Sequence, residues 1–306
     1  MDNRLQYLSG LRYFEAAARR QSYSKAAEEL FVSQAAVSQK IRQLEESLGC
    51  KLFYRQGRNM MLTPQGSSLF TDVSRGFDQI LAGLNRIQAE PLEGILTVNT
   101  SRSFASRWLM PRLWKFTMIH PDISIRVDAT AENPDMKYGR ADLAIRQGFK
   151  NDFGDGIQSC ILYEEPVYPL CSPELAHSIK FTHPEQLLKC WLVHWAETCN
   201  LTWARWFEAA DVHMPERNLQ WMEVSTFEMG LNAVMAGHGA CLGTLSLAGD
   251  YLDNGLLVQP FDIGLVPGIR YTLFYDPTSP RMARAQAFID WLKQEVSLLQ
   301  TERALP

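Results

Sequence analysis

The sequence predicts an α/β fold in three parts: a small helical head ending in a β-hairpin, a long connecting helix, and two α/β lobes. Three observations lead to this prediction. Apolar residues recur at helical spacing through roughly the first 50 residues, a heptad pattern follows them, and strand-like runs then alternate with helices. At 306 residues the chain suits two or three domains. We place their boundaries at 1–63 for the head, 64–90 for the connecting helix and 91–306 for the lobes.

The head begins with three predicted helices. An apolar stripe over residues 5–20 indicates the first, and Tyr23-Ser24 offers an N-cap for a short second helix. Ser33 offers the N-cap of a third helix, which ends before Gly49. Two short helices joined by a tight turn are typical of a helix-turn-helix.

The third helix has a buried face and an outward face. Its apolar residues are spaced 4, 3 and 4 apart and so share one side: Val37, Ile41, Leu44 and Leu48. At about 100° per residue, a short and mostly polar set projects from the opposite side: Ala35, Ser38, Gln39 and Arg42. Such side chains suit base edges in a major groove, whereas Lys40, beside the buried face, suits phosphate contact. An ordinary solvated helix carries the same residue types, so the neighbouring elements decide between the two interpretations.

Residues 51–62 predict a β-hairpin, or wing, after the third helix. Two short apolar runs flank a turn at Gly57, which places Arg55 and Arg58 at the tip. A basic hairpin tip beside a recognition helix suits phosphates or the minor groove, and ordinary solvated loop charges are the alternative. The head is therefore predicted to be a winged helix-turn-helix.

A long helix is predicted from Thr63-Pro64 to about residue 90, where Pro91 and Gly94 mark a boundary. Six apolar residues recur at intervals of 3, 4, 3, 4 and 3: Phe70, Val73, Phe77, Ile80, Leu84 and Ile87. This heptad seam predicts a two-stranded coiled coil and hence a homodimer, whose two-fold symmetry favours an inverted-repeat DNA site. A helix packed on its own domain would show a wider apolar face.

Strand-like runs begin at Gly94. We expect strands at 94–99, 123–130 and 141–146, with a helix at 103–119 between the first two. Strand, helix and strand in this order predict a parallel βαβ arrangement.

A second group of strands and helices is expected over 165–268, with strands near VYPLC, WLVHW and ACLGT. A strand at 270–276 and a helix at 281–298 close the chain. The expected lobes are about 91–164 together with 269–306, and about 165–268. Two α/β lobes with a cleft between them are a common ligand-binding architecture.

Polar side chains gather where the first strand gives way to a helix: Thr100, Ser101, Arg102 and Ser103. Hydroxyls and free backbone N–H groups at a helix N-terminus suit an anionic group, and helix capping by Ser101 or Ser103 is the alternative. Further candidates lie at strand ends or helix starts: Thr130, Gln147, His194, Thr226 and Thr244. The hypothesis is a small carboxylate ligand, such as an amino acid.

Charge is divided unevenly along the chain. Residues 1–65 carry ten Lys and Arg against six Asp and Glu, whereas the remainder carries 20 against 28. A basic head on an acidic body is expected when only the head meets phosphates. The N-terminus has no secretory pattern and no apolar run has the length of a membrane span. We therefore expect a cytoplasmic protein without a membrane partner.

Two rival classes are an enzyme and an exported solute-binding protein. The first lacks support because the chain has no P-loop, GxGxxG, HExxH or GxSxG pattern, and the glycines of 237–243 are wrongly spaced for a dinucleotide. The second conflicts with the head and with the N-terminal sequence. Six cysteines and six histidines show no metal-ligand spacing. We expect no catalytic residue, no cofactor and no metal.

The chain resembles the LysR-type transcriptional regulators over essentially its whole length. The segment SKAAEELFVSQAAVSQKIRQLE and the following LFYR…R…LTPQG carry the resemblance. In the second half, SFASRWLMPRL and HPDISIRV are similar to the branch of glycine-cleavage and D-serine activators. The resemblance implies a DNA-binding regulator switched by a small effector, with two lobes similar to periplasmic binding proteins. It also implies homodimers that pair into homotetramers, with promoter DNA and RNA polymerase as partners.

The resemblance also implies DNA-contacting positions in the head. Together with the residues chosen above they make the predicted DNA-binding set: Ser24, Ser33, Gln34, Ala35, Ser38, Gln39, Lys40, Arg42, Arg55 and Arg58. Many members carry other residue pairs where this chain has Gln39-Lys40, so the operator sequence is not transferable from relatives.

Overall fold

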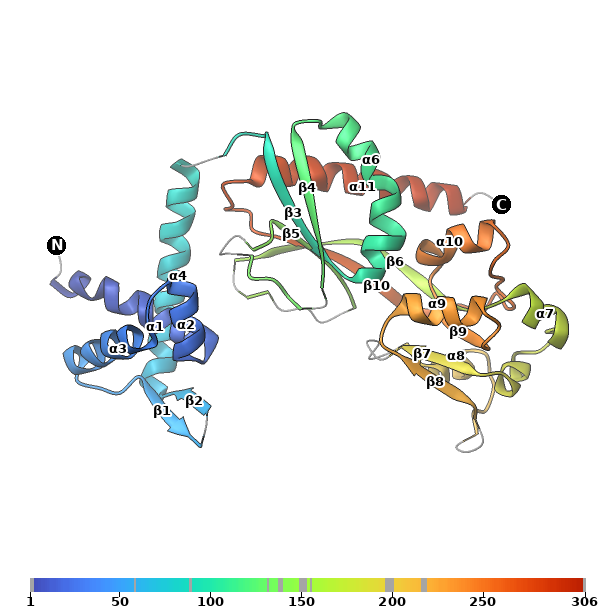
Figure 1. The fold of residues 1–306 in the computed structure, drawn as a ribbon, viewed down its shortest axis with the longest axis horizontal. Coiled ribbons are helices and arrows are strands. Elements are labelled where there is room, and N and C mark those ends of the chain that lie inside the picture. Colours follow the sequence, from blue (N-terminus) through green and yellow to red (C-terminus); the bar gives the residue numbers. More distant parts are fainter. Residues whose placement is uncertain are drawn as a thin grey trace. The chain divides into compact units, whose positions relative to one another are not determined.

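The structure is a computed structural model that describes residues 3–57, 59–87, 90–130, 132–136, 140–148, 153–154, 156–195, 201–215 and 219–304. The chain divides into two compact units, Met1–Ile87 and Gln88–Pro306. Figure 1 colours them by position in the sequence, from blue at the N-terminus to red at the C-terminus. None of the described helices has the length and apolarity that crossing a membrane requires. The predicted winged helix-turn-helix, connecting helix and two-lobed α/β domain are all confirmed.

The first unit contains four α-helices, a 3-10 turn and a hairpin among its described residues. They are η1 (Asn3–Tyr7), α1 (Leu8–Arg20), α2 (Tyr23–Leu30), α3 (Gln34–Leu48), β1 (Phe53–Gln56), β2 (Asn59–Leu62) and α4 (Pro64–Ile87). Thr63 caps α4 as its threonine-proline start predicts, because its hydroxyl accepts a hydrogen bond from the Gly66 amide at 3.0 Å. The helix is described as far as Ile87, and residues 88 and 89, just before its expected end at about residue 90, lie outside the described residues.

The N-cap of α2 is a correction. The Ser22 hydroxyl accepts a hydrogen bond from the Lys25 amide at 3.3 Å, so the helix begins one residue before the predicted cap, Ser24. Tyr23 is already helical, and its ring packs edge-on against Phe53 at 5.7 Å between centroids. Ser22 and Ser24 are equally suitable N-cap residues, and the contact between Tyr23 and Phe53 favours the helix start at Tyr23.

Small residues let the helices of the head approach closely. Ala16 and Ala17 of α1 pack with Ala26 and Ala27 of α2 against a buried Val37 and its neighbour Ile41 in α3. A second cluster unites Phe14, Ala18, Leu44 and Leu52, and both are essentially inaccessible to water. Burying each large apolar side chain contributes about 1.5–3 kcal/mol, which positions α3 rigidly.

The second unit is built on one sheet of eight described strands in the order β4-β3-β5-β10-β6-β9-β7-β8. The strands are β3 (Gly94–Thr100), β4 (Ile123–Ala129), β5 (Leu143–Gln147), β6 (Gln158–Cys171), β7 (Leu192–Trp195), β8 (Trp221–Val224), β9 (Ala240–Gly243) and β10 (Leu265–Tyr275). Strand β3 pairs in parallel with β4 and β5, as the βαβ pattern predicts. The short edge strand β8 was not predicted, because it has only four residues, of which Val224 alone is buried.

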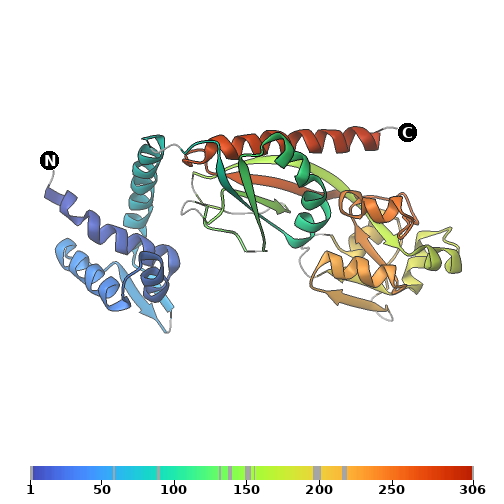
Figure 2. The same cartoon turned by 45° about the horizontal axis from the view of Figure 1, so that its top comes forward.

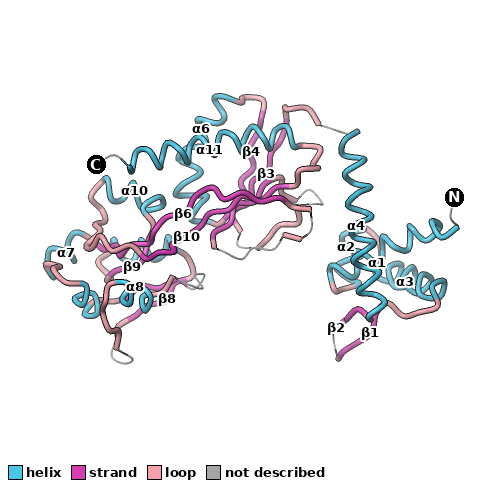
Figure 3. The backbone as a smooth tube through the Cα atoms, turned by 180° about the vertical axis from the view of Figure 1, so that it is seen from behind, coloured by secondary structure: helices cyan, strands magenta, loops and turns pink. Residues whose placement is uncertain are grey.

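Two long antiparallel strands, β6 and β10, connect the lobes, and Figure 3 shows them running from one lobe into the other. They pair with β5 on one side and with β9 on the other, so the expected lobe limits near 164 and 269 fall inside continuous strands. The pairing shifts register between Leu265 and Ile269. Only glycine fits at position 268, because a Cβ there would lie 1.8 Å from the Glu165 carbonyl oxygen.

Helices cover the sheet of the second unit. They are α5 (Arg102–Phe104), η2 (Ala105–Leu109), α6 (Met110–Ile119), α7 (Pro173–Ile179), η3 (Pro184–Lys189), α8 (Trp203–Ala209), α9 (Phe227–Met235), α10 (Leu245–Asp253) and α11 (Met282–Ala304). The predicted single helix at 103–119 is interrupted by η2, which is a π-helical turn. Figure 2 shows α6 close to α11, where the Phe116 ring packs against Phe288 at 5.1 Å between centroids.

Candidate nucleic-acid interface and ligand pocket

Helix α3 presents the predicted reading face to solvent. The Ser33 hydroxyl caps the helix by accepting the Ala36 amide at 3.2 Å, and Gly49 ends it at φ +70°. The buried stripe lies where the spacing predicts, with Val37 fully buried. Most of the predicted DNA-binding residues on and near the helix are exposed, and Ser38 is half-buried: Ser24, Ser33, Gln34, Ala35, Ser38, Gln39, Lys40 and Arg42.

Cations in the head fall into two groups. Arg19 and Arg20 are held by protein carboxylates: Arg19 Nε lies 2.8 Å from Glu15 Oε1 and Arg20 Nε lies 2.6 Å from Glu29 Oε2. Burial by itself raises the pKa of Glu29. The hydrogen bonds from both arginines together have a larger opposite effect, so the pKa is below its ordinary value. Within the described part of the chain, Lys40 and Arg42 have no such carboxylate partner and remain available to phosphates.

The wing is a short antiparallel hairpin. Strands β1 and β2 pair with Arg55 opposite Met60, and Gly57 turns at φ +63°, a conformation that glycine adopts without strain. Arg55 is exposed. Arg58 lies outside the described residues, so its proposed contact stays a prediction.

The predicted seam of α4 divides into two parts. Phe70 packs against the cluster of Phe14 and Leu44, and Val73 is 9% exposed, so this end belongs to the core of the head. Phe77 is half-buried. Beyond it the apolar residues face solvent, with exposed fractions of 51% for Ile80, 48% for Leu84 and 84% for Ile87.

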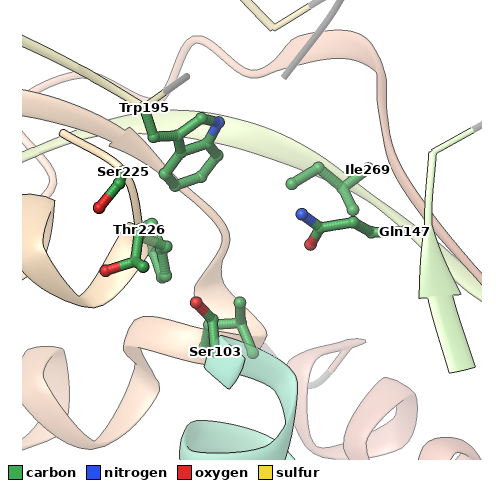
Figure 4. Close-up of a pocket in the computed structure, with 8 residues that line it drawn as sticks. Ser103, Gln147, Trp195, Ser225, Thr226 and Ile269 are labelled. Carbon is green, nitrogen blue, oxygen red and sulfur yellow. The ribbon is translucent and has the colours of Figure 1, made fainter. Parts of the chain in front are cut away.

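A pocket lies among elements of both lobes, and Figure 4 shows Ser103, Gln147, Trp195 and Thr226 around it. It is lined by Ser103, Gln147, Trp195, Ser225, Thr226, Phe227, Leu247 and Ile269. Its empty space is about 300 Å³, a value that includes space open to solvent. Three of the predicted effector residues, Ser103, Gln147 and Thr226, meet here.

The hydroxyl groups in and next to the pocket make different hydrogen bonds. Ser101 caps the first helical turn by accepting the Phe104 amide at 3.4 Å, which leaves the side chain of Ser103 facing the pocket. The Thr226 hydroxyl accepts the Met229 amide at 3.2 Å and so sits at the N-terminus of α9. Among the described residues, no Asp, Glu, Lys or Arg lines the pocket. The site therefore offers hydroxyls, an amide and a helix N-terminus, a set suited to hydrogen bonding of a small polar ligand.

The other predicted effector residues lie outside this lining. Thr100 is the last residue of β3 and Thr244 precedes α10, and both are fully buried. The Thr130 hydroxyl accepts a hydrogen bond from Asn99 at 3.0 Å. His194 is half-buried in β7, where its neighbour Trp195 lines the pocket instead. Roles in binding for these residues, and for Ser101 and Arg102, stay predictions.

Sequence reasoning missed five lining residues. Ser225 and Phe227 flank the predicted Thr226 and were within reach of the same argument. Trp195, Leu247 and Ile269 are apolar residues in strands or a helix, where they are indistinguishable from core residues until the chain is folded.

Thiols and metal ligands form no further site in the part of the chain that the structure describes. Its five cysteines are free, and no group of three His, Cys, Asp or Glu is placed to hold an ion. Burial raises the pKa of Cys171 to about 12 and that of Cys190 to about 11, which keeps both as unreactive thiols. Cys199 lies outside the described residues.

Comparison with known proteins matches both halves of the chain. Residues 8–67 match the bacterial regulatory helix-turn-helix protein of the lysR family, and residues 89–297 match the LysR substrate binding domain. The glycine cleavage system transcriptional activator of Escherichia coli (strain K12) is 36% identical over 294 residues, covering 95% of this chain and 94% of that protein. The chain belongs to the LysR family. This LysR-type regulator thus combines a DNA-binding helix-turn-helix with an effector-binding domain.

Two further similarities support this assignment. The HTH-type transcriptional regulator DsdC of Escherichia coli (strain K12) is 32% identical over 297 residues, covering 94% of each chain. The solved effector domain of AmpR from Pseudomonas aeruginosa is 26% identical with a TM-score of 0.60, and covers 69% of this chain and 99% of that one. The resemblance to LysR-type regulators, including the glycine-cleavage branch, is confirmed.

Proposed function

We propose that this LysR-type regulator senses a small carboxylate, such as an amino acid, in the pocket between its lobes. The presence of Ser103, Gln147 and Thr226 in one lining carries the proposal, because three segments far apart in the sequence bring hydrogen-bonding residues to the same pocket. A carboxylate would accept from the two hydroxyls and interact with the positive end of α9.

A buried guanidinium precedes the pocket residue Gln147 on β5, although successive side chains of a strand point to opposite faces and Arg146 does not line the pocket. Arg146 is 5% exposed. Within the described part of the chain its hydrogen bonds go to neutral oxygens, including the Glu132 carbonyl at 2.7 Å and the Asn133 side-chain oxygen at 3.0 Å. Burial lowers the pKa of Arg146 to about 10, so it stays charged at neutral pH with no carboxylate partner among those residues. These oxygens solvate the guanidinium, so the case for a carboxylate rests on the groups that line the pocket.

The relatives agree with this chemistry. One of them is named as an activator of the glycine cleavage system. By analogy we propose an amino-acid-linked target gene, and a regulator rather than a catalyst, since both Escherichia coli relatives are transcriptional regulators.

Calorimetric titration of the full chain with a panel of amino acids tests the ligand. We expect one to bind, and Ser103→Val to weaken its binding about tenfold through loss of a hydrogen bond. Ser124→Val is the matched control, because Ser124 is exposed on β4 outside the pocket. Binding of an uncharged or aromatic compound, with no amino acid bound, contradicts the carboxylate assignment.

We further propose the division of labour along the chain. Residues 1–63 bind double-stranded promoter DNA in the cytoplasm, residues 64–90 pair two chains, and residues 91–306 bind the effector. The exposed end of the α4 seam supports a homodimer, and two dimers would form a homotetramer able to contact RNA polymerase. A gel shift with promoter DNA and the mass of the free protein by light scattering test these assignments. Turnover of a substrate without any specific DNA shift would overturn them.

A further inference from the structure

The π-helical turn η2 joins the two lobes beside the pocket. The Ser106 hydroxyl hydrogen-bonds to Glu228 Oε1, in the first turn of α9. Arg107 Nε donates to the Leu247 carbonyl oxygen of α10 at 3.2 Å. Thus two consecutive residues of one lobe bind two different helices of the other.

Arg107 makes two further contacts with α10. Its guanidinium carbon lies 3.8 Å from the centroid of the Tyr251 ring, and its Nη2 lies 3.7 Å from Asp250 Oδ2. The Arg107 side chain is 16% exposed whereas that of Asp250 is 64% exposed, so water screens the ion pair. The stacked ring and the hydrogen bond to Leu247 are therefore the stronger contacts.

These contacts adjoin the pocket lining. Ser103 precedes Ser106 by one helical turn, Thr226 precedes Glu228 by two residues, and Leu247 both lines the pocket and accepts from Arg107. Elsewhere, the chain passes between the lobes through β6 and β10. A π turn inserts an extra residue, and such turns frequently occur at functional sites. Here it places Ser106 and Arg107 against the opposite lobe.

We infer that Ser106 and Arg107 form a clamp that holds the first turns of α9 and α10 over the pocket. The effector enters when the clamp opens and is retained when it closes, so the clamp links pocket occupancy to the spacing of the lobes. This consequence for the effector rests on the proposed function. The clamp itself is a property of the free protein.

Hydrogen–deuterium exchange of the full chain without ligand tests the clamp. In Arg107→Met we expect amides at the start of α10, such as Ala248, to exchange about tenfold faster, because opening of the clamp exposes them. In Ser106→Ala we expect the amides of Met229 and Gly230 in α9 to exchange about tenfold faster, for the same reason. Asp250→Asn should change these rates less than about threefold.

Controls separate a local clamp from general destabilisation. Asp253→Asn on the same helix and Arg126→Met on β4 alter exposed side chains outside the clamp and should leave every rate unchanged. Amides of β3 should keep their wild-type rates in all variants, and Arg107→Lys should partly restore protection of α10. Exchange that accelerates uniformly through the unit, or does not accelerate at α9 and α10, overturns the clamp. Because no effector is added, this outcome is independent of whether a carboxylate binds.

Discussion

Glu45 shows how one buried carboxylate connects the recognition helix to the wing. Its side chain accepts from the Leu52 amide at 2.9 Å, from the Phe53 amide at 3.3 Å, and from Lys51 Nζ at 2.6 Å. Burial by itself raises the pKa of Glu45. The hydrogen bonds from Lys51 and the two amides together have a larger opposite effect, so the pKa is below its ordinary value. The carboxylate therefore fixes the start of β1 against α3.

Glu45→Gln should lower the stability of the head by about 1–3 kcal/mol at neutral pH, because the amide replaces a charged acceptor. The folded pKa is below the unfolded one, so the carboxylate stabilises fully above about pH 4.3 and loses this effect as pH falls through the folded pKa. Calorimetry of the head transition between pH 7 and pH 3 measures the difference. The exposed neighbour Glu46→Gln is the control, and a difference that persists unchanged at pH 3 refutes the assignment.

Gln39 and Lys40 should respond differently to alanine substitution. Gln39→Ala should relax sequence preference at one or two base pairs, at about 1–3 kcal/mol, because Gln39 faces outward and is proposed to read base edges. Lys40→Ala should weaken binding to every DNA and reduce the salt slope by about one unit, because it removes the proposed phosphate contact. Quantitative gel shifts on operator and mismatched DNA at several salt concentrations distinguish the two. Identical behaviour would contradict the face assignment.

At the scale of elements, the apolar stripe of α4 has a buried part and an exposed part. Its beginning completes the core of the head through Phe70 and Val73, and its end is exposed from Ile80 onward. An exposed heptad seam is stable when a second copy covers it.

Ile80→Asp should weaken the dimer about 100-fold or more, because pairing would bury an unpartnered carboxylate. Gln79→Asp is the matched control, since it adds the same charge one residue away at an exposed position outside the seam. Sedimentation velocity over a range of concentrations measures both. Equal effects of the two variants would show that charge, rather than the seam, controls association.

At the scale of the whole molecule, a cluster of charges anchors the start of the second unit. Arg284 is 3% exposed and donates to the Ile95 carbonyl at 2.8 Å and to Glu90 Oε2 at 2.6 Å. Arg281 donates to Glu90 at 3.1 Å and to the buried Asp142 at 3.2 Å. The segment that follows the connecting helix is thus tied to α11 within one unit.

Arg284→Met should destabilise the second unit by about 2–3 kcal/mol, through loss of hydrogen bonds between charged groups. For a unit of this size that shift lowers its melting temperature by about 5 °C or more, while the transition of the head stays in place. Differential scanning calorimetry resolves the two transitions, with Arg126→Met as control. A parallel shift of both transitions would mean that the units do not melt independently.

Local patterns of the sequence by themselves determined the head, the connecting helix and the parallel βαβ start of the second unit. Caps such as Ser33 and Gly49 act within one turn, and the stripe containing Val37 and Ile41 repeats every helical turn. Such signals are local in the chain, so they survive without knowledge of tertiary contacts. Where two local signals were equal, as for Ser22 and Ser24, a contact with distant Phe53 decided the register.

The tertiary structure alone decided which residues meet in the pocket and how the α4 seam divides. Trp195, Leu247 and Ile269 come from separate segments, and the path of β6 and β10 between the lobes brings them together. Likewise, only the folded structure shows that Phe70 packs in the core of the head with Phe14 while Ile87 is exposed. These facts depend on long-range packing, which spacing along the chain does not encode. The basic, winged head could thus be predicted from the sequence, whereas the residues of the pocket could be identified only from the fold.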